Sequence, residues 1–98
     1  MYTDSIFNYI LGTWYSSSLN FIIFKMRNLD LEKKLGAKIA YLRKYRRVSQ
    51  EKLAEKTEIS EIYIGKIERG DANPTLEKLK LIANALDVEI SELFNFSL

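Results

Sequence analysis

Residues 49–70 of the chain read SQEKLAEKTEISEIYIGKIERG. Ser49 is suited to cap a short helix over about residues 50–56, because its side-chain oxygen can accept a hydrogen bond from a backbone N–H of the first turn. After a separation of three residues, Ser60 can cap a second short helix, and Gly70 supplies a C-terminal stop for it. Two short helices joined by so brief a turn must cross at a steep angle.

The residues before this pair predict one longer helix. Asp30 is suited to be its N-cap, and the helix is expected to end near Tyr45. An apolar stripe at spacings of four and three, typical of one helix face, supports it: Leu31, Leu35, Ile39 and Leu42.

The residues after the pair predict two more helices. Pro74 favours an extended backbone before it, and Thr75 can then cap a fourth helix. One face of that helix is apolar: Leu76, Leu79, Ile82, Ala83 and Leu86. A fifth helical turn over about residues 90–94 closes the domain. No segment after Met26 alternates with period two for long, so the fold class is all-α with five helices.

Length and composition limit the function. A chain of 98 residues has room for one compact domain, and its 47% hydrophobic and 29% charged residues are typical of a globular one. It contains no cysteine and no histidine, so the commonest general base and the commonest transition-metal ligands are absent. We therefore expect no enzyme, no metal site and no cofactor, and the lack of cysteine fits the reducing cytoplasm.

The charge is concentrated in one stretch. The net charge of +2 is too small to indicate nucleic-acid binding by itself, but residues 33–47 contain seven bases and no acid. Such a run is either a solvated helix face or a surface for nucleic acid, and composition leaves both interpretations open.

Residues 1–25 differ from the rest, with one acid and one base among many aromatic and β-branched residues. We divide the chain there, into an N-terminal extension over 1–25 and a domain over 26–98. The extension allows three interpretations: sequence upstream of a true start at Met26, an extra helix or hairpin that packs on the domain or a partner, or a weak membrane anchor. Asn8, Asn20 and the serines at 16–18 interrupt it, so it is poorly suited to span a bilayer.

Residues 49–70 resemble the helix-turn-helix of the Cro/cI (Xre) repressor family. The flanking segments LGAKIAYLRKYRRV (35–48) and NPTLEKLKLIANALDVEISELF (73–94) extend the resemblance to about 60 of the 98 residues. It implies a five-helix, lambda repressor-like DNA-binding domain with an N-terminal extension, which binds a double-stranded DNA operator. The narrower resemblance is to restriction-modification controller proteins and compact phage-type repressors.

The third helix carries the predicted base-reading positions, which lie on one helix face: Glu61, Ile62, Gly65 and Lys66. A helix capped at Ser60 can project its first side chains into a major groove about 12 Å wide. Lys66 could donate to guanine, Glu61 could accept from cytosine N4 and Ile62 could touch a thymine methyl. The alternative for each is an exposed position without base contact.

The resemblance also implies phosphate contacts: Gln50, Ser60, Tyr63, Arg69, Asn73, Arg46 and Arg47. Gln50 opens the second helix, whose free N–H groups favour an anion, although glutamine is also simply a good first-turn residue. Tyr63 could instead pack in the core. Arg43 and Glu68 match an ion pair between the first and third helices, which we take as structural.

Two residues depart from the family pattern. Glu58 occupies the turn where the family commonly has glycine, at a steric cost if the backbone there is left-handed. Gly65 lies in the middle of the third helix, at a cost of about 1 kcal/mol relative to alanine. Either that helix is less rigid than usual, or its backbone comes close to DNA.

A single domain of this kind contacts a few base pairs, so specificity needs a two-fold dimer on a palindromic operator. The predicted dimer interface is the apolar C-terminus: Leu93, Phe94, Phe96 and Leu98. Alternatively, Leu93 and Phe94 close the core. The rival functions are a protein-interaction module of the same fold, such as an antitoxin or a coactivator-binding domain, and a membrane-tethered sensor. The sequence does not identify the operator, the regulated gene, an effector or the sign of regulation.

Overall fold

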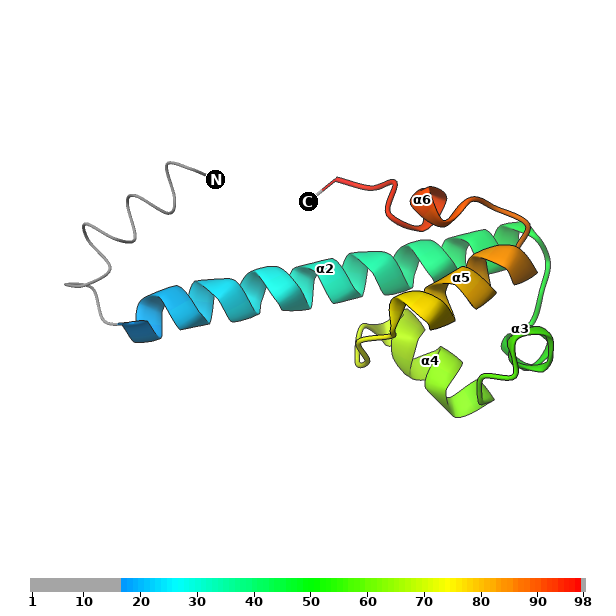
Figure 1. Cartoon of the computed structure of the whole chain (residues 1–98), viewed down its shortest axis with the longest axis horizontal. Helices are drawn as coiled ribbons and strands as arrows, with labels where there is room; N and C mark the ends of the chain where they lie inside the picture. The colour runs from blue at the N-terminus through cyan, green and yellow to red at the C-terminus, as the bar shows by residue number, and fades with distance from the viewer. Residues whose placement is uncertain (1–16, 98) are drawn as a thin grey trace.

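Five helices and no strand make up residues 17–97, which are the residues described by the computed structural model; side chains are described from Asp30 to Ser97. In chain order they are α2 (Ser17–Tyr45), α3 (Gln50–Thr57), α4 (Glu61–Arg69), α5 (Leu76–Ala85) and α6 (Ile90–Leu93). Figure 1 shows α3, α4 and α5 gathered around the C-terminal half of α2, with α6 beside it. The predicted all-α fold class is confirmed.

The long helix α2 begins earlier than predicted. Asp30 was expected to cap it, but the helix starts at Ser17 and runs through Asp30 without interruption. The reason is that no proline or glycine lies between these two residues, so nothing stops the helix on the N-terminal side. The predicted end at Tyr45 is confirmed. The division at Met26 and the role of residues 1–25 stay predictions, since residues 1–16 lie outside the described part.

Three of the four predicted N-caps are confirmed, at Ser49, Ser60 and Thr75. The Ser49 hydroxyl accepts from the Lys52 backbone N–H at 2.9 Å, and the Ser60 hydroxyl accepts from the Tyr63 N–H at 3.1 Å. Thr75 caps α5 in the same way. Each side chain satisfies a backbone donor that the first helical turn leaves unpaired, so the start of every helix in the 50–85 region is fixed locally.

The turn between α3 and α4 is held by a buried threonine. The Thr57 hydroxyl donates to the Leu53 carbonyl at 2.8 Å and accepts from the Ile59 N–H at 3.3 Å. Glu58, which follows, has a left-handed backbone with φ of 60°. The predicted steric cost at Glu58 is therefore present in this fold.

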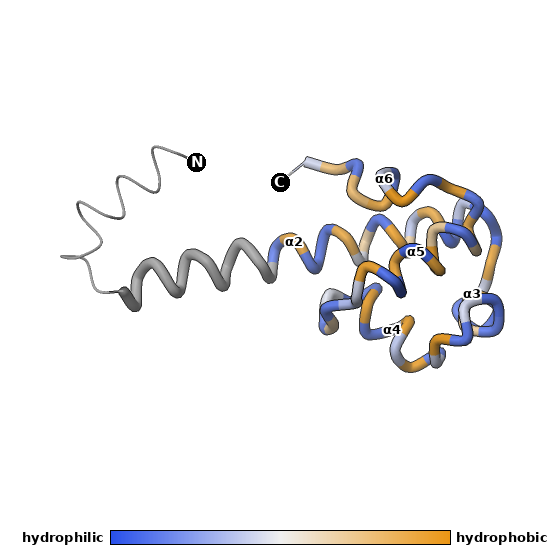
Figure 2. The backbone as a smooth tube through the Cα atoms, in the orientation of Figure 1, coloured by the Kyte–Doolittle hydropathy of each residue, from blue (hydrophilic) through white to orange (hydrophobic). Residues whose placement is uncertain are grey.

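All five helices contribute to the core, and Figure 2 shows hydrophobic residues recurring along α4 and α5 between hydrophilic ones. Its buried members are Leu35, Ile39, Leu42, Leu53, Ile59, Ile64, Ile67, Leu79, Ile82, Ala83, Leu86 and Leu93. Two apolar residues predicted to face inward are instead exposed, Leu31 at 36% and Leu76 at 64%. Leu76 is the first residue of α5.

Helices α2 and α4 touch backbone to backbone at a glycine. A Cβ built on Gly36 would lie 2.1 Å from the Ile67 carbonyl oxygen and 2.8 Å from that of Glu68. Only glycine permits this approach, which sets the position of the C-terminal half of α4 against α2.

The C-terminal segment returns to α2 through both apolar and polar contacts. Leu93 of α6 is fully buried, and the Glu92 carboxylate lies 3.2 Å from the Lys38 ammonium of α2. Among the described residues, none of the helices combines the length and the hydropathy needed to span a bilayer.

Candidate nucleic-acid interface

Helix α4 separates a packing face from an outward face. Ile64 and Ile67 are buried, at 0% and 1% exposure, as predicted for the inner face. Ile62 is 74% exposed, and Glu61 and Lys66 are exposed as well. A branched apolar side chain held so far into solvent contributes nothing to the core, so Ile62 leaves apolar surface on the outward face of α4.

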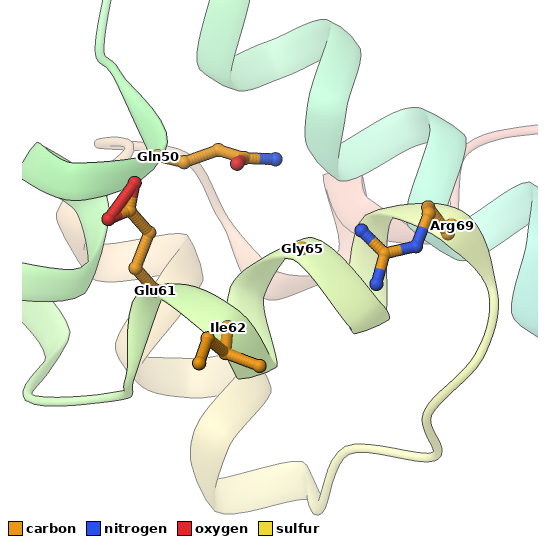
Figure 3. Close-up of a pocket in the computed structure, with 5 residues that line it drawn as sticks. All are labelled: Gln50, Glu61, Ile62, Gly65 and Arg69. Carbon is orange, nitrogen blue, oxygen red and sulfur yellow. The ribbon is translucent and has the colours of Figure 1, made fainter.

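The outward face borders a shallow depression of about 300 Å³, which Figure 3 shows in close-up. Residues from α3 and α4 line it: Gln50, Glu61, Ile62, Gly65 and Arg69. Three of the four predicted base-reading residues are thus brought together with two predicted phosphate contacts. Lys66, the fourth, is exposed on the same helix but does not line the depression.

Behind the depression, three polar side chains join α2, α3 and α4. Arg43 of α2 forms a two-pronged pair with Glu68 of α4, with Nε to Oε2 at 2.7 Å and Nη2 to Oε1 at 3.1 Å. The same guanidinium donates from Nη1 to the Val48 carbonyl at 2.8 Å. Both charged side chains are largely buried, at 11% and 7% exposure. The predicted partners are therefore in contact and hydrogen-bonded, which is the condition for a buried ion pair to be stable.

Gln50 belongs to this network, which the sequence did not indicate. Its Nε2 donates to Glu68 Oε1 at 2.9 Å, so α3 is tied to α4 by the same carboxylate that binds Arg43. One amide N–H is used in this way, and the second remains for a ligand beside the N-terminus of α3. No helical periodicity links residues 50 and 68, so only the folded structure shows the contact.

Two of the predicted phosphate contacts, Ser60 and Tyr63, also have structural roles: Ser60 caps α4 and Tyr63 packs against the core. Because Ser60 uses a lone pair of its hydroxyl as the cap, its O–H can still donate outward. Tyr63 is half-buried against the core, and the Lys78 ammonium lies 4.4 Å from its ring centroid. The cation over the ring is a contact that sequence reasoning missed.

The remaining predicted phosphate contacts lie around the ends of α2 and α4. Arg46 is exposed and donates to the Asp87 carbonyl at 3.1 Å, and Arg47 lies in the turn after α2 with a left-handed φ of 58°. Arg69 is exposed with its Nε 3.4 Å from an Asp71 carboxylate oxygen, and Asn73 is exposed in the loop that follows. Arg46 thus also helps to hold the loop after α5 in place.

The predicted dimer residues divide into buried and exposed. Leu93 belongs to the core of the single chain, as the alternative interpretation expected, and Phe96 packs partly against that core. Phe94 is 41% exposed and offers apolar surface for a contact. Leu98 lies outside the described residues. Residues 30–97 contain no group of carboxylates arranged to hold a metal ion.

This arrangement defines a class of protein: a short capped helix, a three-residue turn and a second helix whose outer face is free, held against a helical core. The chain belongs to the helix-turn-helix family designated HTH_3, whose pattern matches residues 39–93.

Named relatives agree with this membership. The immunity repressor protein of Bacillus phage phi105 is 40% identical over 57 residues, which cover 58% of this chain and 40% of that protein. Control protein C.SmaI of Serratia marcescens is 34% identical over 65 residues, covering 66% of this chain and 77% of C.SmaI. The crystal structure of the restriction-modification controller protein C.AhdI from Aeromonas hydrophila superposes with a TM-score of 0.64 at 40% identity, covering 66% of this chain and 97% of C.AhdI.

Proposed function

We propose that the protein is a transcription regulator that binds a specific double-stranded DNA operator through α4. The observation that carries this proposal is the free outward face of α4, fixed from behind by the Arg43–Glu68–Gln50 network. Base reading needs side chains held in one orientation against the groove, and that network supplies the rigidity.

The geometry suits a major groove, whose width of about 12 Å accommodates one helix. With α4 in the groove, the start of α3 faces the sugar-phosphate backbone, where its unpaired N–H groups and the second N–H of Gln50 favour a phosphate. Lys66 supplies a donor for guanine, Ile62 an apolar contact for a thymine methyl, and Glu61 an acceptor for cytosine N4. A carboxylate at Glu61 repels the backbone phosphates, so this face favours selectivity over nonspecific affinity.

The relatives support a regulatory role for this binding. One is named a restriction-modification controller protein, one a control protein and one an immunity repressor. We infer the same kind of role here, a compact cytoplasmic regulator that is no enzyme. Whether it activates or represses depends on where the operator lies relative to the promoter.

We further propose that the protein acts as a homodimer on a palindromic operator. One α4 helix can contact only a few base pairs, and two copies related by a two-fold axis would place their helices in successive major grooves about 34 Å apart. The exposed Phe94, next to the buried Leu93, is the surface we assign to the contact between copies.

The test is a selection of bound sequences from random duplex DNA at near-physiological salt, with the full chain and the Lys66→Ala variant. Lys80→Ala, a charge-matched change at an exposed position of α5, is the control. We expect an enriched palindrome with half-sites about one helical turn apart, altered by Lys66→Ala and unchanged by Lys80→Ala. Absence of any enrichment would refute operator binding and favour the protein-interaction module.

A further inference from the structure

We propose that Arg69, assigned from the sequence to a phosphate, reads a guanine from within the depression, and that Gly65 makes this possible. The inference rests on the proposed DNA binding and goes beyond it, because it adds a base-reading residue one turn further along α4.

The evidence begins with the direction of the Arg69 side chain. Figure 3 shows its guanidinium pointing back along α4 toward Gly65. A Cβ on Gly65 would lie 3.1 Å from Arg69 Nη1 and 3.9 Å from Cζ, so the guanidinium rests directly on the bare backbone of the helix. A Cβ at position 65 would require the guanidinium to shift by a few tenths of an ångström. The terminal nitrogens thus lie near the middle of the outward face, although Arg69 is the last residue of α4.

A neighbouring carboxylate leaves the recognising end of Arg69 available. Asp71 Oδ2 lies 3.4 Å from Arg69 Nε, which is the guanidinium nitrogen bonded to the side-chain Cδ. Nη1 and Nη2 keep their four N–H groups, and two parallel donors at this spacing match guanine O6 and N7. Arg69 is exposed along most of its side chain, so binding does not require the core to move.

The position of the guanidinium favours a base over a phosphate. Arg69 and Gly65 line the same depression as Glu61 and Ile62, the residues proposed to face base edges. Glu61 and Arg69 are acceptor and donor lining one depression, so together they match the cytosine N4 donor and the guanine O6 and N7 acceptors. A phosphate contact outside the depression would require the guanidinium to leave its position against Gly65.

The experiment compares selections from random duplex DNA with the full wild-type chain and three variants. Arg69→Ala removes the donors, Arg69→Lys keeps the charge but loses the two-nitrogen fork, and Gly65→Ala displaces the guanidinium. We expect wild type to enrich guanine at one position of each half-site. Arg69→Ala should reduce that preference by about 5- to 150-fold and leave other positions unchanged. Gly65→Ala, which only shifts the guanidinium, should reduce the preference at the same position by less. Arg69→Lys should lose most of it while keeping the salt dependence of binding.

Two outcomes would overturn the inference. If Arg69→Ala weakens binding to all sequences equally and the guanine preference remains, Arg69 is a phosphate contact and the inference is wrong, while operator binding stands. If the wild-type chain enriches no sequence, the proposed function is wrong, and this inference, which rests on it, is wrong as well. Because Arg69 is exposed and Gly65→Ala adds only a methyl against a flexible side chain, the variants are expected to fold.

Discussion

Substituting alanine for Gly36 tests whether close helix contact positions α4. The added Cβ would lie 2.1 Å from the Ile67 carbonyl oxygen, whereas carbon and oxygen normally approach to roughly 3.3 Å. Helix α4 would therefore have to move by about 1 Å. Since the same carbonyl accepts from the Gly70 N–H at 3.0 Å, the movement would also disturb the end of α4.

The magnitude follows from two opposing effects. Overpacking of this kind costs about 1–3 kcal/mol or more, and the upper end applies because both sides of the contact are backbone. Alanine in a helix interior regains about 0.5–1 kcal/mol relative to glycine. We therefore expect Gly36→Ala to lower the free energy of unfolding by about 2 kcal/mol, or the Tm by roughly 8–16 °C for a domain of this size.

The measurement is urea unfolding followed by circular dichroism, with Gly65→Ala as the matched control. The control makes the same chemical change in a helix, but its Cβ meets only the end of the flexible Arg69 side chain, at 3.1 Å. It should raise the free energy of unfolding by about 0.5–1 kcal/mol. Equal effects of the two substitutions, in either direction, would refute the argument that the α2–α4 contact is closed to a Cβ.

Four other predictions follow from the site and the turn. Arg43→Ala leaves the buried Glu68 carboxylate without its cationic partner and should cost about 3–5 kcal/mol, measured by the same unfolding experiment, whereas a loss below about 1 kcal/mol would show that solvent replaces the guanidinium. Glu58→Gly removes a left-handed strain of about 1–2 kcal/mol and adds about 0.4–1 kcal/mol of unfolded-state entropy, for a net gain near 0.5–1 kcal/mol that a thermal melt would detect. Lys66→Ala should relax base preference, while Gln50→Ala should lower the binding affinity for all DNA sequences about equally. If a binding titration shows the uniform loss for Lys66→Ala and the relaxed preference for Gln50→Ala, the assigned roles are reversed. Phe94→Ala should shift the monomer–dimer equilibrium toward monomer in sedimentation while leaving the fold intact, and an unchanged equilibrium would place the interface elsewhere.

The sequence predicted those features of the fold that depend on local chemistry. Ser49, Ser60 and Thr75 cap their helices because a hydroxyl can reach an N–H two or three residues later, and this needs no tertiary contact. The start of α2 was not predicted correctly, because it does not depend on the capping side chain alone. Asp30 has the right side chain for a cap, but a capping residue marks a helix start only where the preceding residues leave the helix.

The site was only partly predictable, because its residues meet across three helices. The pairing of Arg43 with Glu68 came from family resemblance, and helical spacing placed Glu61 and Ile62 on the outward face. Neither signal shows that Gln50 shares the Glu68 carboxylate or that the Arg69 guanidinium rests on Gly65. Those contacts depend on rotamers and on the crossing of α3 and α4, which only the packed structure determines.

The two sides of α4 have different roles: the inner side sets the position of the helix, and the outward side is the proposed binding surface. The inner side sets where the helix lies, through two buried isoleucines, the contact at Gly36 and the buried Arg43–Glu68 pair, and each of these is sensitive to substitution. The exposed outward residues make none of these contacts, so changes at Glu61, Ile62 or Lys66 should alter stability by no more than about 0.5 kcal/mol. If α4 reads an operator as proposed, substitutions on the outward face can change the operator preference while the inner face keeps the fold. A loss of DNA binding at these positions would then report recognition and not unfolding.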